Sequence, residues 1–189
     1  TTNELMLYMF DGSFDGLIYP GGANTIEYIS VSPNQEFIAF STLAGSTDFY
    51  ILETANPLTP ALIHSSGDIS GDTTAINWSP DGSKVVYSSD SSGSQEIWTY
   101  NTDGAVFTQL TNTGGITTRK NPIWSPKGDK ILYLDDNDFG YDLLYTMNTD
   151  GSNRLQIANH SSAITNPAWS PDGRKIAFYV ASILLLGLS

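Results

Sequence analysis

The amino-acid sequence predicts an all-β protein built from one antiparallel sheet that is repeated along the chain. Three observations support this prediction: a recurring turn, a recurring tryptophan, and segments of β-branched and aromatic residues that alternate with polar loops. The turn is a Ser-Pro pair, and its prolines are Pro33, Pro80, Pro126 and Pro171. Successive prolines lie 47, 46 and 45 residues apart, a period typical of proteins in which each repeat forms one sheet.

Each Ser-Pro pair is expected to form a type I turn between two strands. Proline fixes φ at the second position of such a turn, and the glycine found at the fourth position in three copies relieves crowding. A tryptophan precedes the proline by two residues at Trp78, Trp124 and Trp169. We interpret these indoles as packing between neighbouring sheets rather than as a ligand-stacking ring, because a bulky apolar residue in every repeat fills that space.

Segments rich in β-branched and aromatic residues follow every turn at strand length. Second strands are predicted at residues 37–40, 84–87, 130–133 and 175–178, and third strands at 49–52, 96–100 and 142–147. Fourth strands are predicted at 107–110 and 154–157, each after an Asp-Gly pair that favours a hairpin, and more weakly at 61–63. Four antiparallel strands in each period form the blade of a β-propeller.

The two ends of the chain match complementary halves of one repeat. Residues 4–12 match a third strand and its Asp-Gly turn, whereas the C-terminal segment supplies a first and a second strand. We therefore predict a single four-bladed β-propeller whose closing blade is shared by the N- and C-terminal segments, which would remove exposed sheet edges. Its predicted parts are a half-blade at 1–28, blades at 29–73, 74–120 and 121–164, and a half-blade with an apolar tail at 165–189.

Composition excludes several classes of function. The formal charge of −12, from 20 acidic and 8 basic residues, repels phosphate backbones, so we expect no nucleic-acid partner. The absence of cysteine excludes disulfides, thiolate zinc sites and cysteine nucleophiles. The longest uncharged apolar run, residues 176–189, has 14 residues, whereas a spanning helix needs about 20, so we expect no membrane span. A start at Thr1 without a signal-like segment fits a mature exported protein or an excised fragment.

Two segments resemble the repeats of a known family. Residues 169–178 read Trp-Ser-Pro-Asp-Gly-Arg-Lys-Ile-Ala-Phe, and residues 147–152 read Met-Asn-Thr-Asp-Gly-Ser. Both resemble the repeats of TolB-like propellers, some of which dock proteins in the bacterial periplasm while others gate serine peptidases. The resemblance implies a propeller fold, an extracellular or periplasmic location, and binding to other envelope proteins. Periplasmic members of the family have six blades and an additional α/β domain, which do not fit in this chain.

The sequence offers little chemistry for catalysis or for metal binding. Neither histidine repeats in register with the turn serines and no Gly-x-Ser-x-Gly motif occurs, so we expect no enzyme activity and no cofactor. The most acidic stretch offers Asp135, Asp136, Asp138 and Asp142 as calcium ligands. It lacks the glutamate that completes an EF-hand, and a solvated hairpin explains it equally, so we predict no metal site.

The C-terminal tail is the feature that no repeat explains. Its large apolar residues are Ile183, Leu184, Leu185, Leu186 and Leu188, which would be costly to leave in water. They are expected either to cover the closing blade of their own chain or to form an interface with a neighbouring copy. Our first hypothesis is a non-enzymatic, exported structural protein that self-assembles through edge strands and this tail into a homo-oligomer, filament or tube. The alternative is a monomeric periplasmic module that docks proteins or binds a ligand.

Overall fold

The computed structural model describes residues 5–8, 14–19, 25–43, 47–55, 61–66, 76–114, 117–136, 142–160 and 162–180. Every regular element in these ranges is a β-strand, and every strand pairs antiparallel with its neighbour. The predicted all-β, antiparallel class is therefore confirmed. Within the same residues, no helix is present that is long and apolar enough to cross a membrane.

The strands form five sheets, named A to E in chain order. Sheet A contains β1 (Leu5–Tyr8) and β2 (Phe14–Tyr19). Sheet B contains β3 (Thr25–Val31), β4 (Phe37–Leu43), β5 (Thr47–Glu53) and β6 (Ala61–Ser66). Sheet C contains β7 (Asn77–Trp78), β8 (Lys84–Ser89), β9 (Glu96–Asn101) and β10 (Val106–Gln109). Sheet D contains β11 (Arg119–Trp124), β12 (Lys130–Asp136), β13 (Asp142–Asn148) and β14 (Leu155–Ala158), and sheet E contains β15 (Ile164–Trp169) and β16 (Ile176–Val180).

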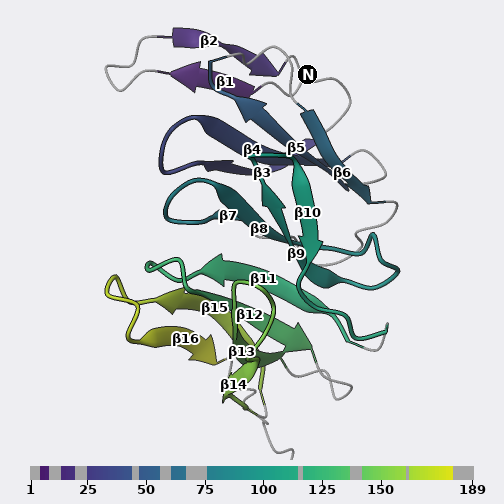
Figure 1. The fold of residues 1–189 in the computed structure, drawn as a ribbon, viewed down its shortest axis with the longest axis vertical. Helices are drawn as coiled ribbons and strands as arrows, with labels where there is room; N and C mark the ends of the chain where they lie inside the picture. Colours follow the sequence, from purple (N-terminus) through teal and green to yellow (C-terminus); the bar gives the residue numbers. More distant parts are fainter. Residues whose placement is uncertain are drawn as a thin grey trace, which may run out of the picture.

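The sheets are stacked in chain order along the long axis of the molecule (Figure 1). In sheets B, C and D, each strand lies beside the next one in sequence. The core lies between the sheets: Ala39 and Phe49 of sheet B, for example, pack against Val85 and Tyr87 of sheet C. Because the second strand of each complete sheet has a sheet on either side, β8 and β12 are buried along almost their whole length.

The first strands of sheets D and E contain a bulge. Asn121 and Asn166 adopt positive φ angles of 53° and 50°, and each is followed by a proline that has no amide hydrogen to donate. Both bulges interrupt the pairing with the second strand, between Lys120 and Ile123 in β11 and between Thr165 and Ala168 in β15. Asparagine tolerates the left-handed region better than most residues, so the Asn-Pro pair encodes the bulge locally.

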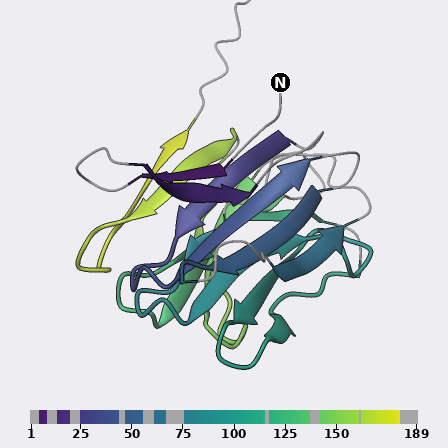
Figure 2. The same ribbon diagram turned by 90° about the horizontal axis from the view of Figure 1, so that it is seen from above.

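Among the described residues, the predicted closing blade is not formed. Sheets A and E are separate two-stranded sheets, and they lie apart along the long axis of the molecule (Figure 1), although they overlap when the molecule is seen from above (Figure 2). Each is held by its own neighbour, since Leu5 of β1 packs on sheet B and Ile176 of β16 packs on sheet D. The indoles of Trp78 and Trp169 reach across to the inner strand of the preceding sheet.

Candidate docking surface

The Ser-Pro turns are closed by their own polar groups. In the turn at residues 79–84, the Ser79 hydroxyl donates to Asp81 Oδ1 at 2.5 Å and accepts from the Lys84 amide at 3.0 Å. These contacts, with the Ser83 amide, hold the pKa of Asp81 below its usual value. Gly82 has a φ of 74° and donates to the Ser79 carbonyl. The turn serines are therefore structural, because their hydroxyls are already engaged.

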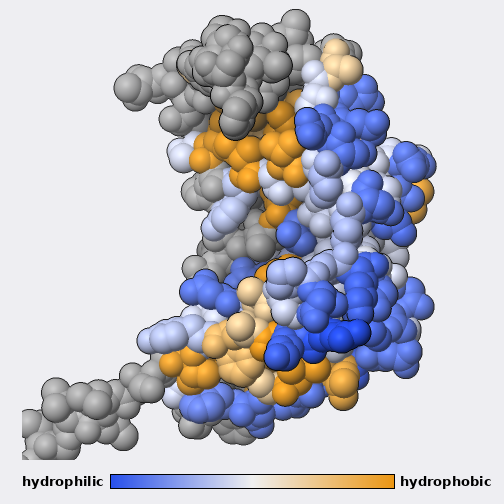
Figure 3. Space-filling model, turned by 90° about the vertical axis from the view of Figure 1, so that its left-hand side faces the viewer, coloured by the Kyte–Doolittle hydropathy of each residue, from blue (hydrophilic) through white to orange (hydrophobic). Residues whose placement is uncertain are grey.

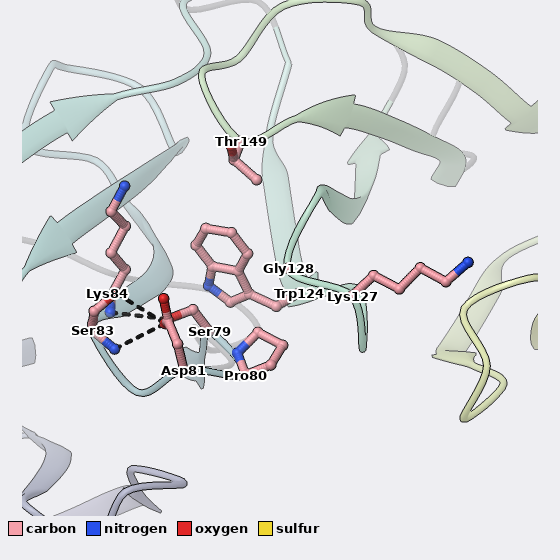
Figure 4. A pocket seen from close by; sticks show the side chains of 9 residues that line it. All are labelled: Ser79, Pro80, Asp81, Ser83, Lys84, Trp124, Lys127, Gly128 and Thr149. Carbon is pink, nitrogen blue, oxygen red and sulfur yellow. Dashed lines mark hydrogen bonds between the residues drawn. The ribbon is translucent and has the colours of Figure 1, made fainter.

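A small pocket lies where this turn faces sheet D (Figure 4). It has a volume of about 200 Å³, and Trp124 and Thr149 reach it from sheet D. Lys84 and Lys127 carry the positive charges at its rim, while Asp81 is occupied by its hydrogen bonds within the turn. The pocket therefore contains no convergent set of free acid, base and nucleophile.

The predicted tryptophans lie between inner strands. Trp78 and Trp124 are buried and Trp169 is half-buried. Trp78 Nε1 donates to the Ser30 carbonyl at 3.1 Å, and Trp169 Nε1 approaches the Ile123 carbonyl at 3.4 Å. The prolines that follow, Pro33, Pro80, Pro126 and Pro171, are exposed at the turns. In this arrangement the indoles of Trp78 and Trp169 join neighbouring sheets, while Trp124 lines the small pocket beside the 79–84 turn.

A network of four charges, of which Glu96, Arg119 and Asp135 are buried and Arg154 is exposed, joins sheets C and D. Arg119 donates to Glu96 at 2.7 Å and forms an ion pair with Asp135 at 3.1 Å, and Arg154 forms a further ion pair with Asp135. The Arg154 guanidinium also lies 4.2 Å from the centre of the Tyr145 ring. Burial alone would raise the pKa of Glu96, but hydrogen bonds from threonine side chains and from Arg119 outweigh it and lower that pKa. No local sequence pattern signals this network, because its members come from separate strands.

The network includes one of the four aspartates that the sequence offered as calcium ligands. Asp135 is buried and directed at two arginines, which already neutralise the charge that a calcium ion would require. Asp136 is half-buried at the end of β12. Asp138 and the side chain of Asp142 lie outside the described residues. Among the described residues, no group of three or more acidic, histidine or cysteine side chains is placed to hold a metal ion.

The outer side of β16 is a candidate docking surface. Among the described residues β16 pairs only with β15, so its other edge has no neighbouring strand. Phe178 and Tyr179 on this strand are exposed. In Figure 3, hydrophobic surface gathers toward both ends of the stack, with mainly hydrophilic surface between them. The predicted interface residues, Ile183, Leu184, Leu185, Leu186 and Leu188, lie outside the described residues.

Comparison with known proteins supports the sequence resemblance. No protein-family model matches the chain. The Tol-Pal system protein TolB of Syntrophotalea carbinolica is 41% identical over 61 residues, which cover 32% of this chain and 13% of that protein. The TolB of Francisella tularensis subsp. tularensis is 35% identical over 101 residues, covering 50% of this chain and 22% of that protein. The matched segments thus cover less than a quarter of the length of these relatives.

Comparison with solved structures defines the fold class. A putative TolB from Agrobacterium tumefaciens superimposes with a TM-score of 0.72 at 24% identity, covering 97% of this chain and 66% of that one. The stacked antiparallel sheets are thus those of a β-propeller. More specifically, the chain is similar in sequence and fold to the TolB-like propellers.

The same comparisons include proteins whose names denote enzymes. The uncharacterized peptidase YuxL of Bacillus subtilis is 28% identical over 110 residues, covering 55% of this chain and 16% of that protein. An oligogalacturonate lyase solved in complex with manganese has a TM-score of 0.66 at 12% identity, covering 93% of this chain and 52% of that one. At this identity the likeness shows the fold alone, and propellers support many functions.

Proposed function

We propose that the chain is a non-enzymatic protein-docking module and that its partner binds at the open edge of β16. The observation that carries this proposal is the exposure of Phe178 and Tyr179 on a strand whose second edge is unpaired within the described part of the chain. An unpaired edge offers main-chain donors and acceptors, and flanking apolar side chains supply contact area. The similarity to TolB, which is named as a Tol-Pal system protein, supports docking over catalysis.

The proposed location is the periplasm or, more broadly, the cell envelope. It is supported by the same similarity to TolB and by the resemblance of the repeats to exported propellers. The absence of cysteine is compatible with this location, because the fold does not depend on a disulfide. Other envelope proteins are the corresponding class of partner.

A second candidate function is structural. The open edge of β16 also favours self-assembly, because a head-to-tail contact between identical chains produces a ring or an open filament. In this hypothesis the apolar tail with Ile183 and Leu188 adds to the contact between copies. Deleting residues 183–189 tests the tail: assembly that is unchanged by the deletion would remove the tail from the interface.

Site-specific photo-crosslinking tests docking at β16. A photoreactive amino acid replaces Tyr179 in one variant and Leu155 in a control variant, since both side chains are exposed on strands. After irradiation in cells, we expect a protein adduct from position 179 that is at least tenfold more abundant than any adduct from position 155. Equal yields at the two positions, or none at position 179, would rule out β16 as the docking edge.

A further inference from the structure

β16 has the sequence of a buried central strand but lies at an open edge. Phe178 follows its Ser-Pro proline by seven residues, as Phe40, Tyr87 and Tyr133 follow theirs. Those three rings are 0%, 2% and 0% exposed, whereas Phe178 is 38% exposed. In each complete sheet a third strand flanks the second one, and β16 has no such strand among the described residues.

One face of β16 is uncovered as well. Tyr179 is 62% exposed, although its counterparts Ser88 and Leu134 are each 1% exposed. Leu134 is covered by sheet E, where it lies in one cluster with Ile164. Within the ranges that the structure describes, β16 therefore has neither a third strand beside it nor a following sheet over its second face, both of which the complete repeats have.

Strand β1 has the complementary deficiency. Leu5 lies six residues before the Asp11-Gly12 pair, just as Leu144 lies six residues before Asp150. Leu5 is buried against sheet B, as Leu144 of β13 is buried against sheet E. By sequence and by packing, β1 is a third strand, yet among the described residues it pairs only with β2. Met6, its next residue, is 45% exposed.

We propose that β1 of a second copy of this chain adds antiparallel to the open edge of β16. The complete sheets set the register, since Tyr87 pairs with Trp98 and Tyr133 pairs with Tyr145 at these repeat positions. The same register places Met6 of one copy opposite Phe178 of the other. This inference rests on the proposed docking at β16 and takes a second copy of the chain, in place of another envelope protein, as the partner that binds there.

A second copy fits the edge better than the chain's own hairpin does. Sheets A and E lie apart along the long axis of the molecule, and separate core clusters hold them there (Figure 1). In the proposed junction, sheet B of the incoming copy covers Ala177 and Tyr179 and so continues the packing that sheets A to E already repeat. Neither β1 nor β16 contains a charged residue. The two strands therefore do not repel each other, although the chain has a net charge of −12.

Sedimentation velocity over a concentration series tests the proposal with three single substitutions. Tyr179→Lys blocks the β16 side and Met6→Lys blocks the β1 side, because lysine on an edge strand opposes strand addition. Leu155→Lys is the matched control, because Leu155 is equally exposed, at 61%, on the outer strand of a complete sheet. All three side chains are exposed, so the single chain should fold in each variant, which circular dichroism checks.

The expected result is concentration-dependent assembly of the wild type and of Leu155→Lys, and monomers for the other two variants alone. An equimolar mixture of Met6→Lys and Tyr179→Lys should form a 1:1 dimer, because the first retains an intact β16 and the second an intact β1. A wild type that stays monomeric at all concentrations would overturn the proposal, as would assembly that requires removal of residues 183–189. Loss of assembly in Tyr179→Lys but not in Met6→Lys would preserve docking at β16 and overturn β1 as its partner.

Discussion

Arg119 donates a 2.7 Å hydrogen bond to Glu96, and this buried ion pair joins the first strand of sheet D to the third strand of sheet C. The Glu96 carboxylate also accepts hydrogen bonds from Thr111 and Thr113, on the segment that connects the two sheets. The pair therefore fixes the connection between sheets as well as their contact. Because the pair is buried, removing one partner should lower the free energy of unfolding strongly, since an unpaired charge in the interior is costly.

Replacing Glu96 should destabilise the fold strongly. Glu96→Gln leaves Arg119 with a buried charge that is only partly compensated, and we expect a loss of about 3–5 kcal/mol in the free energy of unfolding. Urea denaturation at neutral pH measures this loss. Glu53→Gln is the control: Glu53 is exposed on β5, and its substitution should change the free energy by less than about 0.5 kcal/mol. Similar losses in the two variants would contradict the role of the buried pair.

The same carboxylate should make stability depend on pH in acid. The pKa of Glu96 is lowered from 4.5 in the folded state, so the folded protein binds this proton less readily than the unfolded chain does. The contribution is complete above about pH 4.5 and is lost as the pH falls through the folded-state pKa. The difference in unfolding free energy between wild type and Glu96→Gln should therefore shrink below pH 4.5. A difference that stays constant into strong acid would disagree with this assignment.

The two buried tryptophans allow packing to be separated from hydrogen bonding. Trp78 Nε1 donates to the Ser30 carbonyl, whereas Trp124 Nε1 is buried without a hydrogen-bond partner among the described residues. Trp78→Phe should therefore cost about 1 kcal/mol more than Trp124→Phe, the usual net value of one hydrogen bond. Thermal unfolding of the two variants provides the comparison, and equal costs would mean that only ring volume matters.

Gly151 marks a close approach of the β13–β14 turn to sheet C. A Cβ at this position would lie 2.5 Å from the Leu110 carbonyl oxygen, and φ is 85°. Gly93 has a similar φ of 93° but open space around it. Gly151→Ala should therefore lower the melting temperature more than Gly93→Ala does, because it adds a steric clash to the backbone strain that both share. Equal shifts would show that the turn moves away at no cost.

The strands were largely predictable because their signals are local. The aromatic and β-branched run after Pro80 predicts a strand at 84–87, and β8 covers Lys84–Ser89. Likewise the run at 142–147 before an Asp-Gly pair corresponds to β13, Asp142–Asn148. Turn chemistry and side-chain shape act within a few residues, so one sequence is enough to read them.

Features that depend on distant contacts were not predictable. How one sheet sits on the next depends on contacts such as those of Trp78 and Trp169 with the preceding inner strand, which join residues 48 and 46 positions apart. The acidic stretch suggested a calcium loop, but Asp135 is paired with arginines whose proximity no spacing rule reveals. The sequence did indicate that residues 165–180 supply only the first two strands of a blade, but whether β1 of the same chain would pair with β16 depends on contacts far apart in sequence.

The central claim, that β16 receives β1 of a second copy, is tested most directly by disulfide cross-linking between differently labelled chains. The protein has no cysteine, so Met6→Cys and Phe178→Cys each introduce a single thiol. Mixing the two variants under mild oxidation should give a covalent heterodimer, since directly opposed residues of paired strands lie within disulfide reach. Mixing Met6→Cys with Ala177→Cys should give at least tenfold less, because adjacent residues point to opposite faces. Equal cross-linking of the two mixtures, or none in either, would contradict the proposed junction.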